Sequence, residues 1–495
     1  MKILVTGGTG LIGESTVREL LRRGHQVRVL ARHAGRDEPS IPASVETWRG
    51  DVTKSESLRG AADGCDAILH AAGIVDEEPP ARTFQRVNVD GTRYVLLEAE
   101  RAMVRKVVYV SSLGAERGAS PYHKSKYVAE DVVRAFTRDS VVLRPGPVYG
   151  PGDEHISLLL RMVRSTPVIP TVGDGNQKFQ PIWHEDLARA LAIALERDDV
   201  RCVSYDIAGT ELTSQNDLVA RFRSLTGRNV VQAPLPEIVT SWAIRALGTL
   251  GVNVPFNESQ LAMLSEGNVI PAGATNALTD IFGVAPTKLA DGLRRLADEQ
   301  PPQLPDQGVG ALIRRRYTID VRGSRWDADR LFEHLRTRLP SLLPPIVRPV
   351  DADRARIDEG ETLTFELPLR GQMQVRVAEV MDRRITLLTL AGHPIAGAVR
   401  FLVELCDDAL RFEVQVYDRP ASMFDALLLR SVGQWVQRGV WTELARNVVE
   451  AAGGSASAVR VDEETLNDHE REVVNEWAAT LSAQLSRKST SSGRD

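Results

Sequence analysis

Cysteine is scarce in this sequence. Its three cysteines, Cys65, Cys202 and Cys406, lie far apart and form no C-x-x-C pair. This spacing argues against a disulfide framework and against a cysteine-based zinc site, so we expect no bound metal. Unpaired cysteines fit a reducing compartment, and the sequence therefore predicts a cytoplasmic protein.

Long apolar runs are also missing. The most apolar late stretch, residues 238–252, is interrupted by Arg245 and is too short to span a bilayer. We expect a buried or half-buried helix there. At the start of the chain, "MKILV" runs directly into a glycine-rich turn, which is not the pattern of a signal peptide. The sequence therefore predicts no transmembrane segment.

A strong charge of either sign is absent as well. The formal net charge is -5, which gives no electrostatic reason to expect nucleic acid or an anionic membrane as a partner. A content of 43% hydrophobic and 26% charged residues is typical of a globular protein. A chain of 495 residues exceeds one ordinary core, so we expect two or three domains. The oligomeric state is not predicted.

Short apolar runs alternate with helical patterns from residue 1 to about residue 150. The runs "KILVT", "QVRVLA", "VETWRG", "AILHAA", "KVVYVSS" and "SVVLRP" predict strands, and amphipathic segments such as "ESTVRELLRRG" separate them. Nearly all-apolar strands that alternate with helices indicate a parallel sheet covered on both faces. We therefore predict a Rossmann-type, doubly wound α/β domain over residues 1–300, in which residues 150–300 mainly form a small substrate-capping region.

The second half of the chain has a different pattern. Residues 301–308 belong to a polar, proline-rich stretch typical of an extended linker. Six strand-like runs, from "ALIRRRYTIDV" to "LRFEVQVYD", then predict an antiparallel meander. A helical run of about thirty residues follows and completes an α+β domain over residues 309–452. For residues 453–495 we predict a helical segment and a disordered polar tail, "LSRKSTSSGRD".

The turn after the first strand, "TGGTGLIG", holds four glycines in two overlapping spacings. Gly8, Gly10 and Gly13 form G-x-G-x-x-G, whereas Gly7, Gly10 and Gly13 form G-x-x-G-x-x-G. Between a strand and a helix, such a turn is typical of dinucleotide binding, because glycine lets a diphosphate approach the backbone. The helix N-terminus adds unpaired N–H groups and the positive end of the helix dipole.

The end of the second strand bears on the choice between NAD and NADP. An acid ~20 residues after the glycines would bind the ribose 2′-hydroxyl of NAD. Here Arg32 occupies that place, and the next acid is Asp37. A guanidinium suits a 2′-phosphate, so the sequence predicts NADP, with NAD as the alternative. Asp51 follows the third strand, where it either lies beside an adenine or caps the next helix.

A second motif, Tyr122-x-x-x-Lys126, occurs in "SPYHKSKYVAE". Together with "VTGGTGLIG", "GDVT", "ILHAAG", "YVSS" and "LRPGPVYGPGD", it resembles the extended or atypical short-chain dehydrogenase/reductase family, which is NAD-dependent epimerase/dehydratase-like. The resemblance covers residues 1 to about 300. It implies the glycine register Gly7, Gly10 and Gly13 and a Ser–Tyr–Lys site. Its serine is Ser112 by position, with Ser111 as the alternative.

The chemistry of such a site follows from its residue types. Tyrosine, with a free pKa near ~10, needs a nearby cation to act as an acid–base catalyst at neutral pH. Lys126, one helical turn after Tyr122, can supply that charge and can also bind the nicotinamide ribose. The predicted cofactor contacts are Gly7, Thr9, Gly10, Leu11, Ile12, Gly13, Arg32, Asp51, Val52, Ala71, Ala72, Gly73, Lys126, Pro145 and Val148.

Three functions are compatible with these motifs. The first is an NADP(H)-dependent oxidoreductase that acts on a carbonyl/alcohol pair, with an apolar substrate as one option. The others are a non-catalytic NAD(P)-binding scaffold or redox sensor, and a nucleotide-sugar epimerase/dehydratase. Only nine residues separate Ser112 from Tyr122, whereas nucleotide-sugar epimerases of the family carry a longer excursion there. The short loop argues against the epimerase.

The later domain carries a resemblance of its own. Gly392-His393-Pro394, Gly397, Phe401 and Arg419-Pro420, ahead of the long helix, resemble an uncharacterised bacterial family with a START-like helix-grip fold. The resemblance implies a curved sheet gripping a helix around an apolar cavity, hence an apolar ligand. His393 is either a ligand contact or a turn residue, and Trp435 and Trp441 belong either to the core or to the binding surface.

Overall fold

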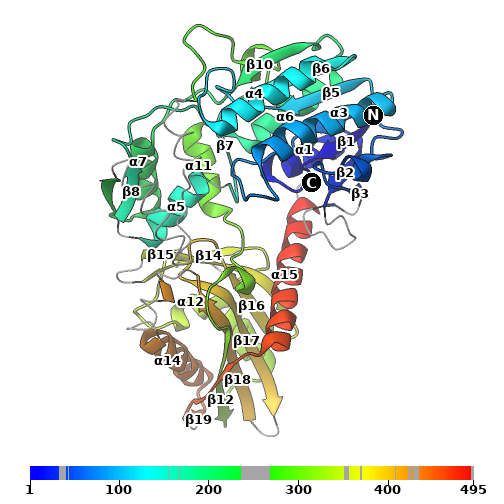
Figure 1. Ribbon diagram of the computed structural model, residues 1–495. Coiled ribbons are helices and arrows are strands. Elements are labelled where there is room, and N and C mark those ends of the chain that lie inside the picture. The colour runs from blue at the N-terminus through cyan, green and yellow to red at the C-terminus, as the bar shows by residue number, and fades with distance from the viewer. Residues whose placement is uncertain are drawn as a thin grey trace. The chain divides into compact units, whose positions relative to one another are not determined.

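The computed structural model describes most of the chain. The described residues are 1–32, 41–42, 44–153, 155–166, 168–235, 268–350, 356–367, 371–406, 409–421, 425–426, 434–456 and 458–491. They fall into two units (Figure 1). The N-terminal unit comprises Met1–Leu159, Val168–Leu225 and Val231–Glu299, and the C-terminal unit comprises Leu160–Pro167, Thr226–Val230 and Gln300–Asp495.

The N-terminal unit contains a seven-stranded sheet in the order β10-β6-β5-β4-β1-β2-β3. Every neighbouring pair in this sheet is parallel, as the apolar runs predicted. The strand order reverses between β1 and β4, and in open parallel sheets ligands bind outside the carboxyl ends of the strands at such a point. The strands are β1 (Lys2–Thr6), β2 (Gln26–Ala31), β3 (Glu46–Arg49), β4 (Ala67–His70), β5 (Lys106–Val110), β6 (Asp139–Pro145) and β10 (Val203–Ile207).

Helices cover both faces of this sheet. Because successive side chains of a strand point to opposite faces, Ile3 and Val5 of β1 enter one apolar core and Leu4 enters the other. The first core includes α1 (Leu11–Arg22), α6 (His184–Glu196) and α10 (Ala277–Asp280). The second includes α2 (Ser55–Leu58), α3 (Gly91–Arg101) and α4 (Pro121–Arg134). Part of the predicted capping region, α6 and β10, thus builds the sheet and its core.

The remaining described elements between β4 and the linker lie outside the seven-stranded sheet, and four of them are short strands that form two pairs. β7 pairs with β9, and β8 pairs with β11, both in parallel. Their bounds are η1 (Gln85–Asp90, a π-helix), β7 (Val148–Tyr149), α5 (Ile156–Ser165), β8 (Val168–Val172), β9 (Ile182–Trp183), α7 (Gln215–Thr226), β11 (Val231–Leu235) and α11 (Leu289–Asp298).

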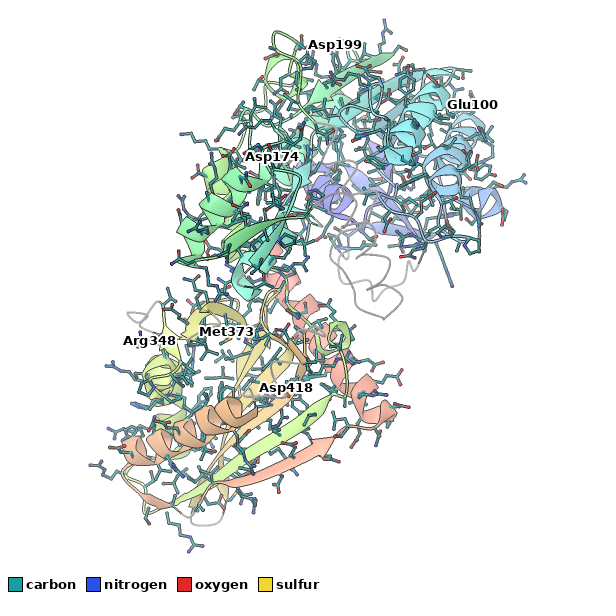
Figure 2. The ribbon with its side chains drawn as sticks, turned by 60° about the vertical axis from the view of Figure 1, so that its left-hand side comes forward. Glu100, Asp174, Asp199, Arg348, Met373 and Asp418 are labelled. Carbon is teal, nitrogen blue, oxygen red and sulfur yellow. The ribbon has the colours of Figure 1, made fainter. Side chains whose placement is uncertain are left out.

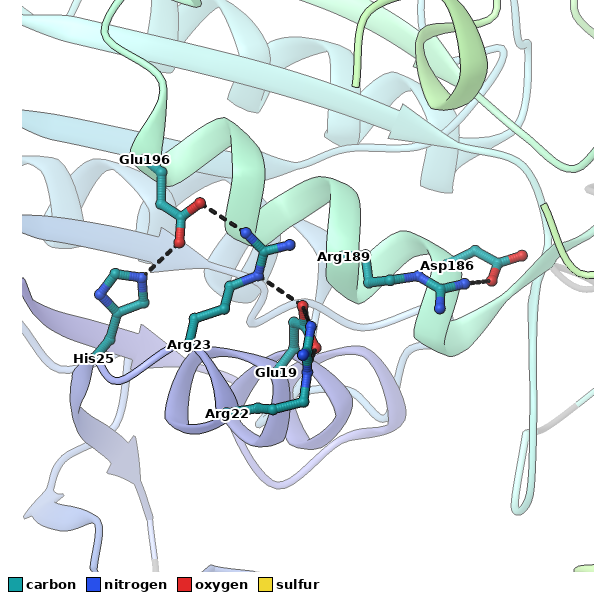
Figure 3. A network of polar contacts seen from close by, with 7 residues as sticks. All are labelled: Glu19, Arg22, Arg23, His25, Asp186, Arg189 and Glu196. Carbon is teal, nitrogen blue, oxygen red and sulfur yellow. Dashed lines mark hydrogen bonds and ion pairs between the residues drawn. The ribbon is translucent and has the colours of Figure 1, made fainter. Parts of the chain in front are cut away.

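Helix α1 is fixed beside α6 by charged side chains (Figure 3). Arg23 and His25, at the end of α1, each place a nitrogen 2.8 Å from a carboxylate oxygen of Glu196 on α6. Glu19 holds Arg23 from within α1 at 2.7 Å. These contacts join the C-terminal end of α1 to α6, so they help to set the direction in which the N-terminus of α1 points.

The C-terminal unit contains a nine-stranded sheet with the path β13-β14-β15-β16-β17-β18-β12-β19, and β20 also pairs with β12. All of its pairs are antiparallel, and β14 to β18 follow one another as predicted. The first run of the predicted meander, β12, departs from the prediction, because it pairs with β18 and not with β14. The bounds are β12 (Ile313–Arg322), β13 (Arg348–Pro349), β14 (Thr362–Leu367), β15 (Gly371–Met381), β16 (Arg384–Thr389), β17 (Ile395–Cys406), β18 (Ala409–Pro420), β19 (Ser455–Ala456) and β20 (Arg460–Thr465).

A buried ion pair joins β12 and β18, which are neighbours in this sheet. Asp418 on β18, labelled in Figure 2, lies 2.7 Å from Arg315 on β12, and both side chains are less than 10% exposed (7% and 8%). Glu463 on β20 accepts a second hydrogen bond from Arg315 at 2.9 Å. Because a buried charge is costly without a partner, these contacts favour the observed pairing of β12 with β18 and β20.

Three of the described helices pack on the C-terminal sheet. Helix α12 (Ala328–Leu342), which was not predicted, and α14 (Gln434–Ala452) share a core with one face. Residues 422–424 and 427–433, which we predicted as part of a longer helix with α14, lie outside the described residues. Helix α15 (Asp468–Ser491) packs on alanines and leucines of the sheet. The prediction of a disordered polar tail was therefore wrong for its first residues, because Leu485 is buried and belongs to the helix.

The proline-rich linker lies along the C-terminal sheet. Gln303 N donates to Thr389 O at 2.7 Å, and Ala391 N donates to Pro301 O at 2.9 Å. The segment is extended as its prolines predict, apart from the short 3₁₀ turn η2 (Pro305–Gln307). It is hydrogen-bonded and not a free spacer. Within the described ranges, none of the helices has both the length and the apolar character needed to cross a membrane.

Candidate active site

The turn after β1 is shaped by close packing. Gly7 adopts φ +72°, and a Cβ atom there would lie 2.7 Å from Ala72 N. A Cβ atom on Gly13 would overlap the Gly7 carbonyl oxygen, and one on Gly8 would lie 2.7 Å from Val29 Cγ1. The fold itself therefore requires glycine at these three positions.

Gly10 is different, because protein packing does not explain it. A Cβ atom there would meet only Gly7 O, at an ordinary 3.6 Å. Gly10 is exposed and is the N-cap of α1, where no side chain accepts a hydrogen bond from the helix. No side chain of the N-cap residue therefore covers the first backbone N–H groups of α1. Such a cradle fits a diphosphate that approaches the backbone.

The Ser–Tyr–Lys residues come together at the carboxyl ends of the neighbouring strands. Tyr122 and Lys126 lie on α4, both less than 10% exposed (8% and 5%), and Ser112 follows β5. Burial raises the pKa of Tyr122, and hydrogen bonding by the Ser112 hydroxyl opposes that rise. Ser111 points elsewhere, since its Oγ donates to Glu130 Oε1 at 2.6 Å. Ser112, and not Ser111, faces the tyrosine.

Lys126 is a buried cation beside this serine and tyrosine. Its Nζ donates to Val110 O at 2.7 Å and lies 4.5 Å from the centre of the Tyr109 ring. Burial lowers the pKa of Lys126 to about 7, against the opposing charge of Glu130. A Cβ atom on Gly73 would lie 3.6 Å from Nζ, so the loop after β4 passes next to the ammonium.

Asn88, which the sequence analysis missed, ties that loop to α4. Its Oδ1 accepts from Ile74 N at 2.9 Å, and its Nδ2 donates to Ser125 Oγ at 3.0 Å. Ser125 Oγ in turn donates to Tyr122 O at 2.7 Å. Asn88 lies in the π-helix η1, a distortion that often marks functional positions. It thereby fixes the loop after β4 against the helix that carries Tyr122.

His70, at the end of β4, was missed as well. Its Nδ1 lies 2.6 Å from Thr6 Oγ1, and its Nε2 lies 2.9 Å from Thr92 Oγ1. Complete burial, together with the charge of Lys126, lowers the pKa of His70 to about 3. The imidazole is therefore neutral at physiological pH and joins β1, β4 and α3 below the glycine turn.

Two of the predicted cofactor contacts, Arg32 and Asp51, follow the ends of strands β2 and β3. Arg32 is exposed directly after β2, and residues 33–40, which include Asp37, lie outside the described residues. Asp51 Oδ1 accepts from Thr53 N at 2.9 Å, which makes Asp51 a turn residue before α2 and not its N-cap. The cofactor roles of these and of the remaining predicted contacts stay predictions: Thr9, Leu11, Ile12, Val52, Ala71, Ala72, Pro145 and Val148.

In the C-terminal unit, the predicted motif residues have local structural roles. His393 Nδ1 accepts from Ile395 N at 3.1 Å within a turn. Phe401 contacts the Trp441 ring edge-on at 6.0 Å within the core, while the Trp435 side chain lies outside the described residues. Trp441 Nε1 and Tyr317 Oη are buried and have no hydrogen-bond partner among the described residues. An apolar ligand of this unit stays a prediction.

Comparison with known proteins identifies the N-terminal unit. Residues 3–208 match the family described as the NAD dependent epimerase/dehydratase family. The ceramide reductase of Caulobacter vibrioides is 36% identical over 258 residues, which are 49% of this chain and 76% of that protein. The chain belongs to the NAD dependent epimerase/dehydratase family.

Other similarities accompany this family assignment. The 2-alkyl-3-oxoalkanoate reductase of Stenotrophomonas maltophilia is 30% identical over 254 residues, 46% of this chain and 76% of that protein. A structure of UDP-glucose 4-epimerase from Thermotoga maritima covers 60% of this chain and 97% of its own, with 21% identity and a TM-score of 0.48. Residues 340–447 match a domain of unknown function, DUF1990. An epimerase/dehydratase-family member with reductase relatives is an NAD(P)-dependent, oxidoreductase-like protein.

Two glycine substitutions separate cofactor binding from folding. Gly13→Ala places a methyl group on the Gly7 carbonyl, so we expect a clear fall in the melting temperature. Gly10→Ala meets no such obstacle, so we expect a smaller fall in the melting temperature, which comes only from the weaker preference of alanine for the N-cap position. Its methyl group would hold a diphosphate off the backbone and weaken NADPH binding by about tenfold, measured by fluorescence titration. Unchanged NADPH affinity in Gly10→Ala would contradict the proposed cradle.

Lys126 gives a pH-dependent stability prediction. Burial lowers its pKa to about 7 in the folded chain, from an ordinary value of 10.5, so the unfolded chain binds the proton more tightly between these values. The cost of the buried charge is complete below pH 7 and is relieved as the pH rises toward 10.5. We expect Lys126→Met to be more stable than the parent at pH 6 by thermal unfolding without cofactor, and the difference to shrink by pH 9. A difference that does not change with pH would contradict it.

Proposed function

We propose that this protein is an NADP(H)-dependent oxidoreductase that interconverts a carbonyl and an alcohol on an apolar, lipid-sized substrate. One observation carries the proposal. Ser112, Tyr122 and Lys126 converge beside the loop after β4, near the β1–β4 reversal of the sheet, where α1 begins without a side-chain cap. Catalytic groups and a cofactor cradle thus share one edge of the sheet.

The residues divide the work of reduction between them. A bound nicotinamide cofactor supplies the hydride that reaches the carbonyl carbon. Tyr122, whose pKa burial raises, holds its proton and gives it to the carbonyl oxygen as the alcohol forms. Lys126, one helical turn away, stabilises the phenolate that remains until a proton from solvent replaces the one transferred. Ser112 binds the substrate oxygen and orients it toward Tyr122.

Two observations support an apolar substrate. Leu113, directly after Ser112, forms a buried apolar cluster with Ala208 and Ile270. Phe84 meets the Tyr122 ring edge-on at 6.0 Å, so an apolar side chain also borders the proton donor. The similar proteins named as a ceramide reductase and a 2-alkyl-3-oxoalkanoate reductase agree with a lipid-sized carbonyl. The following experiment distinguishes this function from the other two that the motifs allow, a non-catalytic scaffold or sensor and a nucleotide-sugar epimerase/dehydratase.

Tyr122→Phe tests the mechanism. The variant keeps the aromatic ring but lacks the phenolic hydroxyl that donates the proton. We therefore expect NADPH binding to persist and turnover to fall by about 10²–10⁴-fold. Turnover is measured as NADPH oxidation with a medium-chain 3-oxoalkanoate, a 3-ketosteroid and an N-acylated 3-ketosphinganine. Tyr127→Phe is the matched control, because Tyr127 lies on the same helix and is 39% exposed.

The outcomes separate the alternatives. If Tyr122→Phe turns over as fast as the parent, the mechanism is wrong. If the parent binds NADPH tightly but oxidises it with none of these carbonyls, the protein acts as a scaffold or sensor. Interconversion of UDP-glucose and UDP-galactose by the parent would favour the epimerase.

Arg32 tests the choice of cofactor. We expect the parent to bind NADPH more tightly than NADH, because the exposed guanidinium after β2 can pair with the 2′-phosphate. Arg32→Ala should weaken NADPH binding by about tenfold and leave NADH binding unchanged. Arg49→Ala, an exposed arginine at the end of the neighbouring strand β3, is the control. Equal affinity of the parent for both cofactors would refute the preference.

A further inference from the structure

Tyr109 is a completely buried residue beside the site that the proposed mechanism does not use. It lies on β5, within the apolar core that α3 and α4 cover. Lys126 Nζ lies over its ring, 4.5 Å from the ring centre. An aromatic face attracts a cation within about 6 Å, because the π-electrons give that face a negative potential. The ring therefore contacts the charged end of a proposed catalytic residue.

Lys126 lacks a counter-ion at contact distance. Its Nζ donates to Val110 O at 2.7 Å, and in the described part of the chain it forms no ion pair. Glu130, one helical turn later, favours the charged form of Lys126, but its carboxylate is bound elsewhere. It accepts from Ser111 Oγ at 2.6 Å and from Arg144 Nη2 at 2.7 Å. A buried ammonium is costly without a partner, so another contact has to stabilise it.

The other titratable groups around Lys126 carry no charge at physiological pH. Burial and the charge of Lys126 lower the pKa of His70, at the end of β4, to about 3. Burial raises the pKa of Tyr122 on α4 and raises that of Tyr109 far above its ordinary value. Gly73, in the loop after β4, has no side chain to contribute. The Tyr109 ring is thus a neutral partner of the ammonium.

The position of this ring is fixed by its neighbour. His70 stacks on Tyr109 with 5.5 Å between the ring centres and 29° between the ring planes. The imidazole is itself held by hydroxyl groups of Thr6 and Thr92 at 2.6 and 2.9 Å. The surface under Lys126 Nζ is therefore a rigid aromatic face and not a mobile side chain.

We propose that Tyr109 is a positioning residue whose ring face takes the place of a counter-ion for the Lys126 ammonium. An ammonium has three hydrogens, of which one goes to Val110 O and another faces the ring. A carboxylate at this place would neutralise the charge that the Tyr122 phenolate needs. The ring holds the ammonium and leaves its charge available. The catalytic consequence rests on the proposed function, but the contact between ring and ammonium does not.

The contact is tested through the pKa of Lys126, which is measured by NMR on the full chain labelled with ¹³C and ¹⁵N in lysine. Loss of one signal in Lys126→Met assigns the residue. We expect Tyr109→Leu, which replaces the ring by an apolar side chain, to lower this pKa by about one unit. Tyr109→Phe keeps the ring and should leave the pKa near the parent value. An unchanged pKa in Tyr109→Leu, or an equal fall in both variants, would overturn the proposal.

Fluorinated rings separate the π contact from packing. Fluorine draws electron density from the ring face and changes the size of the ring little, so it weakens the attraction for a cation. Phenylalanine analogues with one, two or three ring fluorines are incorporated at position 109 of the full chain. We expect the pKa of Lys126 to fall with each added fluorine while the melting temperature stays close to that of Tyr109→Phe. A pKa that does not follow the fluorine number contradicts the proposal even if Tyr109→Leu fails to fold.

The effect on catalysis is measured with the carbonyl that the parent reduces fastest. Because Tyr122 needs the charge of Lys126, turnover should fall as the pH rises through the pKa of Lys126. We expect Tyr109→Leu to move this fall to lower pH by about one unit, and Tyr109→Phe to leave it in place. A merely structural role would lower kcat at every pH without moving the fall, which would refute the catalytic consequence. If the parent reduces none of the carbonyls, the proposed function fails, and the NMR titrations still decide the role of the ring.

Discussion

The close packing of α1 on the turn after β1 is the constraint on which the rest of the site depends. With no Cβ atom on Gly7 and Gly13, the helix starts directly above the carboxyl ends of β1 and β4. That position places the unpaired N–H groups of α1 near the strand order reversal. The contacts of Arg23 and His25 with Glu196 hold the far end of the same helix, so its direction is fixed at both ends.

The parallel sheet and two of the proposed catalytic residues could be predicted from the sequence. Strands that are buried on both faces are rich in Val, Ile and Leu, and such a composition can be recognised in each short apolar run of the sequence. Tyr122 and Lys126 were predicted from the family resemblance, and their spacing of one helical turn agrees with a shared site. Ser111 and Ser112 are adjacent and chemically identical, so only the structure shows that one faces Glu130 and the other Tyr122.

The residues that were missed depend on contacts between distant parts of the chain. His70 contacts Thr6, which is 64 positions earlier, and no local pattern announces such a pair. Asn88 acts on a loop 14 residues before it, from a π-helix that sequence periodicity does not reveal. Helix α12 was a different case. Asp327 caps this helix, and leucine occurs at every fourth residue from Leu331 to Leu339, which is a helical pattern. Pro340 also lies inside the helix, however, and proline is typical of a helix break, so the sequence does not predict this helix clearly.

The hydrogen-bonded segment before β12 changes where the C-terminal unit can be cut. A fragment of residues 309–452 would follow the predicted boundaries but would lose the bond from Gln303 to Thr389. It would also lose α15 and thereby leave the alanine- and leucine-rich face at Ala378 and Leu388 open to water. Uncovered apolar faces of this kind promote aggregation. A soluble fragment for ligand studies should therefore start at residue 300 and extend at least through Leu485.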